Sequence, residues 1–237
     1  MSERAPLPVT TTAPERGRVL LLCPHADDDV IGAGGTCAQH VAQGDFVQVV
    51  IAFSGEAGDP DGRYDAAEYA ALRQKEARAG GAHLGFEHYQ FLGYPEGHEP
   101  SDVELVQAAH HLAGVIRQAA PDIIYCCWIG EYHLDHYVLA RAARLALAIV
   151  GFTGTVWGYE VWTALIPTWI NDVTNEFEKK SLAMREHASQ MDYHDLTHKA
   201  FGLMAQRSMY CDRTARHAEA FAPFGEAPPE DLALLGS

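Results

Sequence analysis

Short apolar runs alternate with longer segments of helical composition along most of this chain. The runs lack alternating polar residues, as strands do when helices cover both faces of their sheet. Strands that alternate with long helices favour right-handed βαβ units, and therefore a three-layer α/β sandwich with a mainly parallel sheet. We expect strands at 18–24, 46–54, 88–93, 122–128 and 155–162, and helices at 30–44, 66–85, 102–120, 136–150, 175–191 and 196–209.

The expected elements fill one domain and leave two ends outside it. Residues 1–17 are rich in Pro, Thr and charged residues, which predicts a flexible N-terminal arm. The body at 18–222 contains no long linker or repeat and is expected to form a single α/β domain. Residues 223–237 are expected to form a C-terminal tail.

The charge and the apolar runs exclude several classes of partner. The formal net charge is −15, whereas a nucleic-acid or acidic-membrane surface calls for a basic excess. No apolar run approaches the ~20 residues that span a bilayer, and the N-terminus has no apolar signal region. The five cysteines are odd in number and contain no CxxC pair, so neither a disulfide framework nor a thiolate zinc site is expected. We therefore expect a cytoplasmic protein that binds neither nucleic acid nor membrane; a homo-oligomer stays open.

Two polar clusters follow directly after expected buried strands. The first, "HADDD" at 25–29, follows the strand at 18–24, and the second, "HLDH" at 133–136, follows the strand at 122–128. Ligands of parallel α/β sheets bind beyond the carboxyl ends of the strands, so both clusters should emerge at the same edge. The sequence therefore predicts one shared polar site.

Histidine and carboxylate side chains are suitable ligands for a divalent metal. His25 and Asp28 are spaced i, i+3, as are His133 and His136, which puts each pair on one face of a helical turn. A cation would also relieve the repulsion between three adjacent carboxylates. From spacing alone, a metal site and a simple helix cap at 27–29 both stay open. The glycines of "GAGG" do not match a dinucleotide fingerprint, and the phosphatase pattern DxDx[TV] is absent.

The sequence also resembles a known family, the LmbE-like or PIG-L metal-dependent N-deacetylases. Its "PHADDD" at 24–29 resembles the family motif PHPDDE or AHPDDE, and "HLDH" at 133–136 resembles HPDH. The segments "SGEAG", "RQKEARAGGAHLG", "FLGYPEG" and "RHAEAF" also resemble family sequence, so the likeness covers most of the body. It implies the Rossmann-like three-layer fold of these deacetylases.

The resemblance implies a zinc site and a general base. The zinc ligands would be His25, Asp28 and His136, although two imidazoles and a carboxylate also suit iron(II). Asp27 resembles the general base. Asp29 replaces the glutamate of the first motif, and we expect it to support the metal ligands without binding the metal itself.

The resemblance further implies roles for residues around the metal. His133 resembles the histidine that stabilises the oxyanion and protonates the leaving amine, and Asp135 would orient it. Expected substrate contacts are Arg73, Glu96, Glu131 and Tyr132. Whether Glu131 or Tyr132 takes part in catalysis stays open.

The implied activity is removal of an N-acetyl group from an amino sugar or glycoside, by amide hydrolysis with zinc-activated water. The expected partner is a small N-acylated substrate that contains a sugar. The same site could act on a non-sugar N-acyl compound or hydrate a small acid. Trp157, Trp162 and Trp169 are expected in the core, with sugar stacking left open; one of His187, His194 and His198 is a candidate for lining a pocket.

Overall fold

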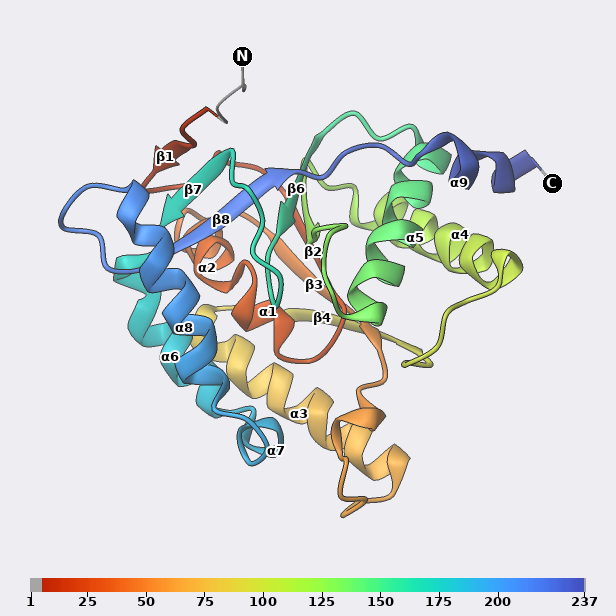
Figure 1. The fold of residues 1–237 in the computed structure, drawn as a ribbon, viewed down its shortest axis with the longest axis horizontal. Helices are drawn as coiled ribbons and strands as arrows, with labels where there is room; N and C mark the ends of the chain where they lie inside the picture. Colours follow the sequence, from red (N-terminus) through yellow and green to blue (C-terminus); the bar gives the residue numbers. More distant parts are fainter. Residues whose placement is uncertain (1–5, 237) are drawn as a thin grey trace.

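A mainly parallel sheet runs through the middle of the structure, with helices on both of its faces (Figure 1). The structure is a computed structural model and describes residues 6–236. The strands are β1 (Val9–Thr11), β2 (Val19–Cys23), β3 (Val47–Phe53), β4 (His88–Tyr94), β5 (Ile123–Cys127), β6 (Thr155–Tyr159), β7 (Trp169–Asp172) and β8 (Ala218–Pro223). The helices are α1 (Asp28–Ile31), α2 (Gly34–Ala42), α3 (Ala66–Leu84), α4 (Asp102–Ala119), α5 (Leu134–Val150), α6 (Phe177–Arg185), α7 (Ala188–Met191), α8 (Leu196–Arg207) and α9 (Pro229–Ala233).

The strand order is β1-β7-β8-β6-β5-β2-β3-β4. The five strands from β6 to β4 run parallel, whereas β8 is antiparallel to both of its neighbours. Helices α4 and α5 pack together on one face, and α2, α3, α6 and α8 lie on the other (Figure 1). The expected three-layer α/β sandwich is therefore confirmed.

The central strands are apolar because both of their faces are covered. Every residue of β2 and β5 is buried, and the two strands pair directly, with Leu22 opposite Cys126. This pairing matters for function, because the chain segments that leave β2 and β5 must then emerge next to each other. No helix in the described part of the chain is both long and apolar enough to cross a membrane.

The helix expected at 30–44 is divided into α1 and α2. The break falls at Gly32 and Ala33, where a Cβ on Gly32 would lie 2.2 Å from the ring of Tyr159. The glycine therefore lets the chain pass close to β6. A short α1 then carries Asp28 and Asp29, separately from the longer helix behind it.

Both chain ends are more ordered than the sequence led us to expect. Within the expected arm, Val9–Thr11 pairs with β7 as strand β1, and Trp169 Nε1 donates a hydrogen bond to Thr11 Oγ1; residues 1–5 lie outside the described residues. Within the expected tail, α9 is held by a bidentate ion pair between Arg141 and Asp231. Strands β7 and β8 were also missed, because they are short, partly polar and lie away from the parallel centre.

Candidate metal centre and active-site pocket

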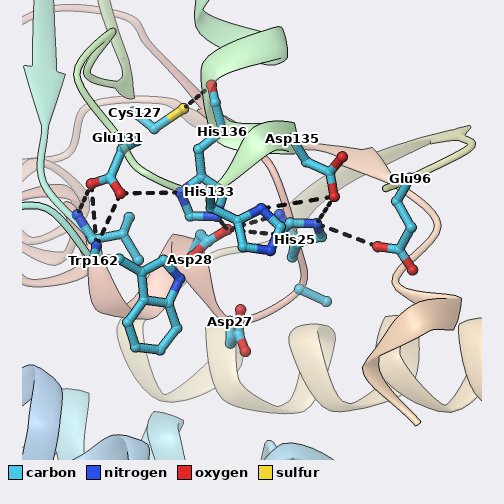
Figure 2. A network of polar contacts seen from close by, with 12 residues as sticks. His25, Asp27, Asp28, Glu96, Cys127, Glu131, His133, Asp135, His136 and Trp162 are labelled. Atoms are coloured by element: carbon cyan, nitrogen blue, oxygen red, sulfur yellow. Dashed lines mark hydrogen bonds and ion pairs between the residues drawn. The ribbon is translucent and has the colours of Figure 1, made fainter. Parts of the chain in front are cut away.

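Two segments that leave neighbouring strands meet at the carboxyl edge of the sheet (Figure 2). The segment after β2 carries the "HADDD" cluster, and the segment between β5 and α5 leads into the "HLDH" cluster. His25 and Asp135, 110 residues apart in sequence, come within 3.1 Å of each other. The structure thus brings the two predicted clusters into one site.

Asp28 places one carboxylate oxygen close to donor nitrogens of both His25 and His136. Asp28 Oδ2 lies 3.4 Å from His25 Nδ1 and 3.3 Å from His136 Nε2. Zinc–ligand bonds of about 2.0–2.2 Å in a tetrahedral arrangement separate neighbouring donors by roughly 3.3–3.5 Å. The two measured edges therefore match the spacing that a tetrahedral metal site requires.

His136 supplies an independent test of this fit. The imidazole is fully buried, and neither ring nitrogen has a hydrogen-bond partner within residues 6–236. Leaving a buried polar atom unpaired costs about 1–3 kcal/mol, so such an atom calls for an explanation. A divalent cation between His136, His25 and Asp28 would pair one of these nitrogens, so the residues fit the group.

The charges in the centre are strongly coupled. Burial lowers the pKa of His136, but the adjacent Asp28 carboxylate outweighs that and raises the pKa to about 9. Burial acts in the opposite direction on Asp28, yet charged His136 and His25 hold the pKa of Asp28 well below its usual range. Without metal the centre is therefore an imidazolium–carboxylate cluster, and metal binding must displace a proton.

Asp135 lies closer to His25 than to His133, the partner that we expected. Its Oδ2 is 3.1 Å from His25 Nε2 and 3.8 Å from His133 Nδ1, while Oδ1 accepts a hydrogen bond from Gly97 N. When Nδ1 of His25 faces the metal side, Nε2 is free to donate to Asp135, an arrangement that fixes the tautomer of a ligand. Glu96 Oε2 approaches the same nitrogen at 3.3 Å.

His133 borders the pocket and is partly exposed. Its ring meets that of His25 edge to face, with the ring centroids 5.0 Å apart. Burial and the positive charges of His25 and His136 lower the pKa of His133. The neutral imidazole is therefore favoured, which can both accept and donate a proton at its two nitrogens.

Asp27 is buried, and it is ion-paired to Arg73 at 3.3 Å. Burial raises the pKa of Asp27 to about 6, although the Arg73 guanidinium opposes the increase. Its backbone φ is +145°, in a region that residues other than glycine rarely occupy. Strain of this kind persists where the surroundings impose it, and it is frequent at active sites.

Asp29 points away from the pocket. It is completely buried, and its Oδ2 accepts a hydrogen bond of 2.6 Å from the hydroxyl of Tyr89, while Oδ1 has no partner among the residues described. Burial raises the pKa of Asp29 to about 7. Its hydrogen bond goes to Tyr89 of β4 and not to the side chains of the proposed ligands, so Asp29 supports the motif from the side of the sheet.

A cavity of about 540 Å³ opens in front of the metal centre. It contains three of the four expected substrate contacts, Arg73, Glu96 and Tyr132; Tyr132 is 92% exposed. Three further polar residues from the C-terminal part of the chain complete the far wall: Gln190, His194 and Lys199. The sequence suggested His194 only as one of several candidates and gave no signal for the other two, which come close only through folding.

Glu131 does not line the cavity, contrary to our expectation of a substrate contact. It is buried, and its carboxylate accepts hydrogen bonds from the backbone N–H groups of Val161, Trp162 and Thr163. Its Oε2 also lies 3.7 Å from His136 Nδ1 (Figure 2). Glu131 therefore contacts the loop at 161–163 and the proposed ligand His136, and it does not face the cavity.

The fold and this site together define a three-layer α/β protein with the donor set of a divalent-metal centre at the carboxyl edge of its sheet. More particularly, residues 20–147, over half of the chain, match the PIG-L family, described as GlcNAc-PI de-N-acetylase. The chain belongs to this family, as the sequence motifs predicted.

Individual relatives agree with this assignment. The chain is 31% identical over 163 residues to a 1D-myo-inositol 2-acetamido-2-deoxy-alpha-D-glucopyranoside deacetylase of Nocardioides sp. strain JS614, covering 56% of this chain and 54% of that protein. The structure of the N,N'-diacetylchitobiose deacetylase of Pyrococcus horikoshii superposes with a TM-score of 0.74 at 26% identity, over 86% of this chain and 82% of that one.

The same fold also occurs in a different type of enzyme. The 4-carboxy-2-hydroxymuconate hydratase of Pseudomonas putida KT2440 superposes with a TM-score of 0.73 at 23% identity, over 86% of this chain and 95% of that one. Fold alone therefore does not decide the reaction. In addition, the chain spans only about half the length of the first curated relative it matches.

Proposed function

We propose that this protein is a metal-dependent hydrolase that removes an N-acetyl group from an amino sugar or glycoside. The observation that carries the proposal is the placement of Asp27, a buried carboxylate with a pKa raised to about 6, in one open cavity with His25 and Asp28, whose carboxylate also contacts buried His136. The names of the relatives in Nocardioides and Pyrococcus support the N-acetyl amino sugar as the substrate class.

Zinc is the metal that we propose for the centre, with iron(II) as the alternative that the donor set also allows. His25 Nδ1, Asp28 Oδ2 and His136 Nε2 would hold it. When bound, the metal supplies Lewis acidity toward an amide carbonyl and toward water. Asp135 and Glu96 hold the far nitrogen of His25.

Asp27 is proposed as the general base. With a pKa of about 6 it is mostly ionised at neutral pH, yet it is basic enough to accept a proton from an attacking water. The ion pair to Arg73 fixes the carboxylate in the cavity. Protonated Asp27 can then return that proton to the departing amine nitrogen.

His133 is proposed to stabilise the negative charge that develops on the amide oxygen. It lines the cavity, and no hydrogen bond from residues 6–236 holds its ring nitrogens, so the ring can turn a donor nitrogen toward substrate. A fixed donor of this kind is worth about 10²–10³ in turnover. Asp135, 3.8 Å away, is close enough to bias the orientation of the ring.

An amine-release assay tests this function. Purified protein is stripped of metal, reloaded with zinc or iron(II), and incubated with N-acetylglucosamine, diacetylchitobiose and N-acetylglucosaminyl glycosides. We expect free amine and acetate in equal amounts, dependent on the metal. Activity only toward acyclic N-acetyl amides, or hydration of an unsaturated acid without acetate release, would replace the sugar deacetylase by one of the other reactions.

A further inference from the structure

Trp162 is a large aromatic side chain exposed at the edge of the metal pocket. It is 46% exposed, whereas Trp169 is buried and Trp128 and Trp157 are partly buried. It lines the same cavity as Asp27 and two of the proposed metal ligands, His25 and Asp28. Figure 2 shows the indole and the Asp27 carboxylate on the same side of the row formed by His25, His133 and His136. An indole left in contact with water at a cavity wall is available to a ligand.

The backbone that carries Trp162 is held rigidly. Glu131 Oε1 accepts hydrogen bonds from Val161 N at 2.6 Å and Trp162 N at 3.2 Å, and Oε2 accepts from Trp162 N at 3.1 Å and Thr163 N at 3.2 Å. These bonds are charge-assisted, and converge on one buried carboxylate.

Thr163 anchors the same loop through two further hydrogen bonds. Its hydroxyl oxygen accepts a hydrogen bond from Tyr132 N, and its carbonyl oxygen accepts one from the indole N–H of Trp128, both at 2.8 Å. The loop is therefore anchored on the segment between β5 and α5. A ligand that contacts Trp162 meets a surface that is already in place and loses little entropy in ordering it.

The wall formed by the C-terminal segments is polar. Gln190, His194 and Lys199 line the cavity together with Trp162, and Lys199 forms no ion pair within residues 6–236. A cavity with an exposed aromatic side chain in its wall and hydrogen-bonding groups elsewhere suits a ligand that has one apolar face and a polar rim. A pyranose ring has this character, because its C–H groups face away from its hydroxyl edge.

We propose that Trp162 is a stacking platform for a pyranose ring of the substrate, and that Glu131 positions this platform relative to the metal centre. The inference rests on the proposed function, because it assigns a place to the sugar of an N-acetylated amino sugar. The electron-rich face of the indole attracts the C–H face of the ring. The Glu131 carboxylate, 3.7 Å from His136 Nδ1, links the platform to a proposed ligand.

The first experiment compares Trp162→Ala and Trp162→Phe with the wild-type protein, all loaded with metal. For methyl N-acetylglucosaminide we expect Trp162→Ala to raise KM about 3- to 10-fold with little change in kcat, and Trp162→Phe to restore most of the loss. For N-acetylethanolamine, which has no ring, KM should not change. Tyr210→Ala is the matched control, because Tyr210 is 40% exposed but does not line the cavity.

A binding measurement separates this inference from the proposed reaction. Methyl N-acetylglucosaminide is titrated into metal-loaded Asp27→Asn protein, with and without Trp162→Phe, while tryptophan fluorescence and the dissociation constant are recorded. Binding with a fluorescence change that disappears in Trp162→Phe supports the platform, even if the wild-type protein releases no amine and the proposed reaction fails. Deacetylation of the sugar with unchanged KM and unchanged binding in Trp162→Ala overturns the platform and leaves the reaction standing. Absence of sugar binding to every variant also overturns it.

Discussion

Two buried polar clusters in this molecule differ in how completely their atoms are paired. The first, the Glu219 cluster, consists of Glu219 and the groups that bond to it behind helix α2. Glu219 accepts hydrogen bonds from Gly35 N and Thr36 N at 2.8 Å and from Lys180 Nζ at 2.5 Å, and Lys180 also donates to Ile31 O. None of these side chains has an unpaired buried atom in the described structure.

The proposed metal centre shows the opposite condition. Both nitrogens of His136 and one oxygen of Asp29 lack hydrogen-bond partners within the described chain, and Asp27 has a strained backbone. Carboxylates and imidazoles crowd together without enough protein donors to satisfy them. Burial and charge are common to both clusters. Unpaired atoms together with backbone strain distinguish the proposed metal centre, and such features are frequent where a bound group or a reaction uses them.

The largest effect on turnover is expected for Asp27, the proposed general base. Asp27→Asn should lower kcat about 10²- to 10⁴-fold, because the amide cannot accept the proton, while the metal content stays near one ion per chain. Metal analysis and amine release on the same preparation check both parts. Asp102→Asn, an exposed acid outside the cavity, is the control. Near-native kcat in Asp27→Asn would remove this residue from the chemistry.

In the Glu219 cluster the expected loss is of stability. Lys180→Met should lower the free energy of unfolding by about 3–5 kcal/mol, because it leaves the Glu219 carboxylate buried without its cation. Urea denaturation of the metal-free protein measures this. The adjacent Lys179 is exposed, so Lys179→Met is a matched control with little expected effect. Equal stability of the two variants would show that the Lys180–Glu219 ion pair does not stabilise the fold.

Glu131 lies between these two cases, because it is well paired yet touches a proposed ligand. Glu131→Gln should weaken metal binding about 10- to 100-fold. The neutral amide orients His136 less well, and its NH2 group cannot accept hydrogen bonds from the backbone N–H groups that Glu131 now binds. Competition with a chelator gives the affinity, and Glu99→Gln serves as an exposed control. Unaltered affinity would confine Glu131 to the Trp162 loop.

A further prediction concerns how the stability of the protein depends on pH through Asp29. Its pKa in the folded protein is raised to about 7 from an ordinary 3.8, so the folded state holds the proton more tightly. The resulting stability is fully present below pH 4 and is lost as pH rises through 7. Asp29→Asn should not show this loss, and the difference in the free energy of unfolding between the two proteins should change by about 4 kcal/mol from pH 4 to pH 8. Parallel unfolding curves across that range would contradict a protonated Asp29.

The sequence predicted the parallel centre and the meeting of the two clusters, because β2 and β5 are uninterrupted apolar runs and polar motifs follow both. It did not predict β1, β7 or β8, whose residues "VTT", "WIND" and "AEAFAP" carry weak strand signals away from the covered centre.

The contacts of Glu131 and Asp135 were also beyond the sequence. Glu131 binds backbone N–H groups some 30 residues further on, and any residue type supplies such groups. Asp135 faces His25 because of the way the loop around Gly97 folds, which its spacing from His133 does not encode.

The bond between Gly35 and Glu219 joins positions 184 residues apart. A growing polypeptide therefore exposes all the proposed ligands to the cell long before the carboxylate that secures helix α2 has been synthesised. A metal ion that binds during translation would find ligands that helix α2 does not yet hold in place. We therefore expect stable metal binding only after the ribosome has released β8. Comparing the metal content of nascent chains stalled before residue 218 with that of the released protein would reveal the step.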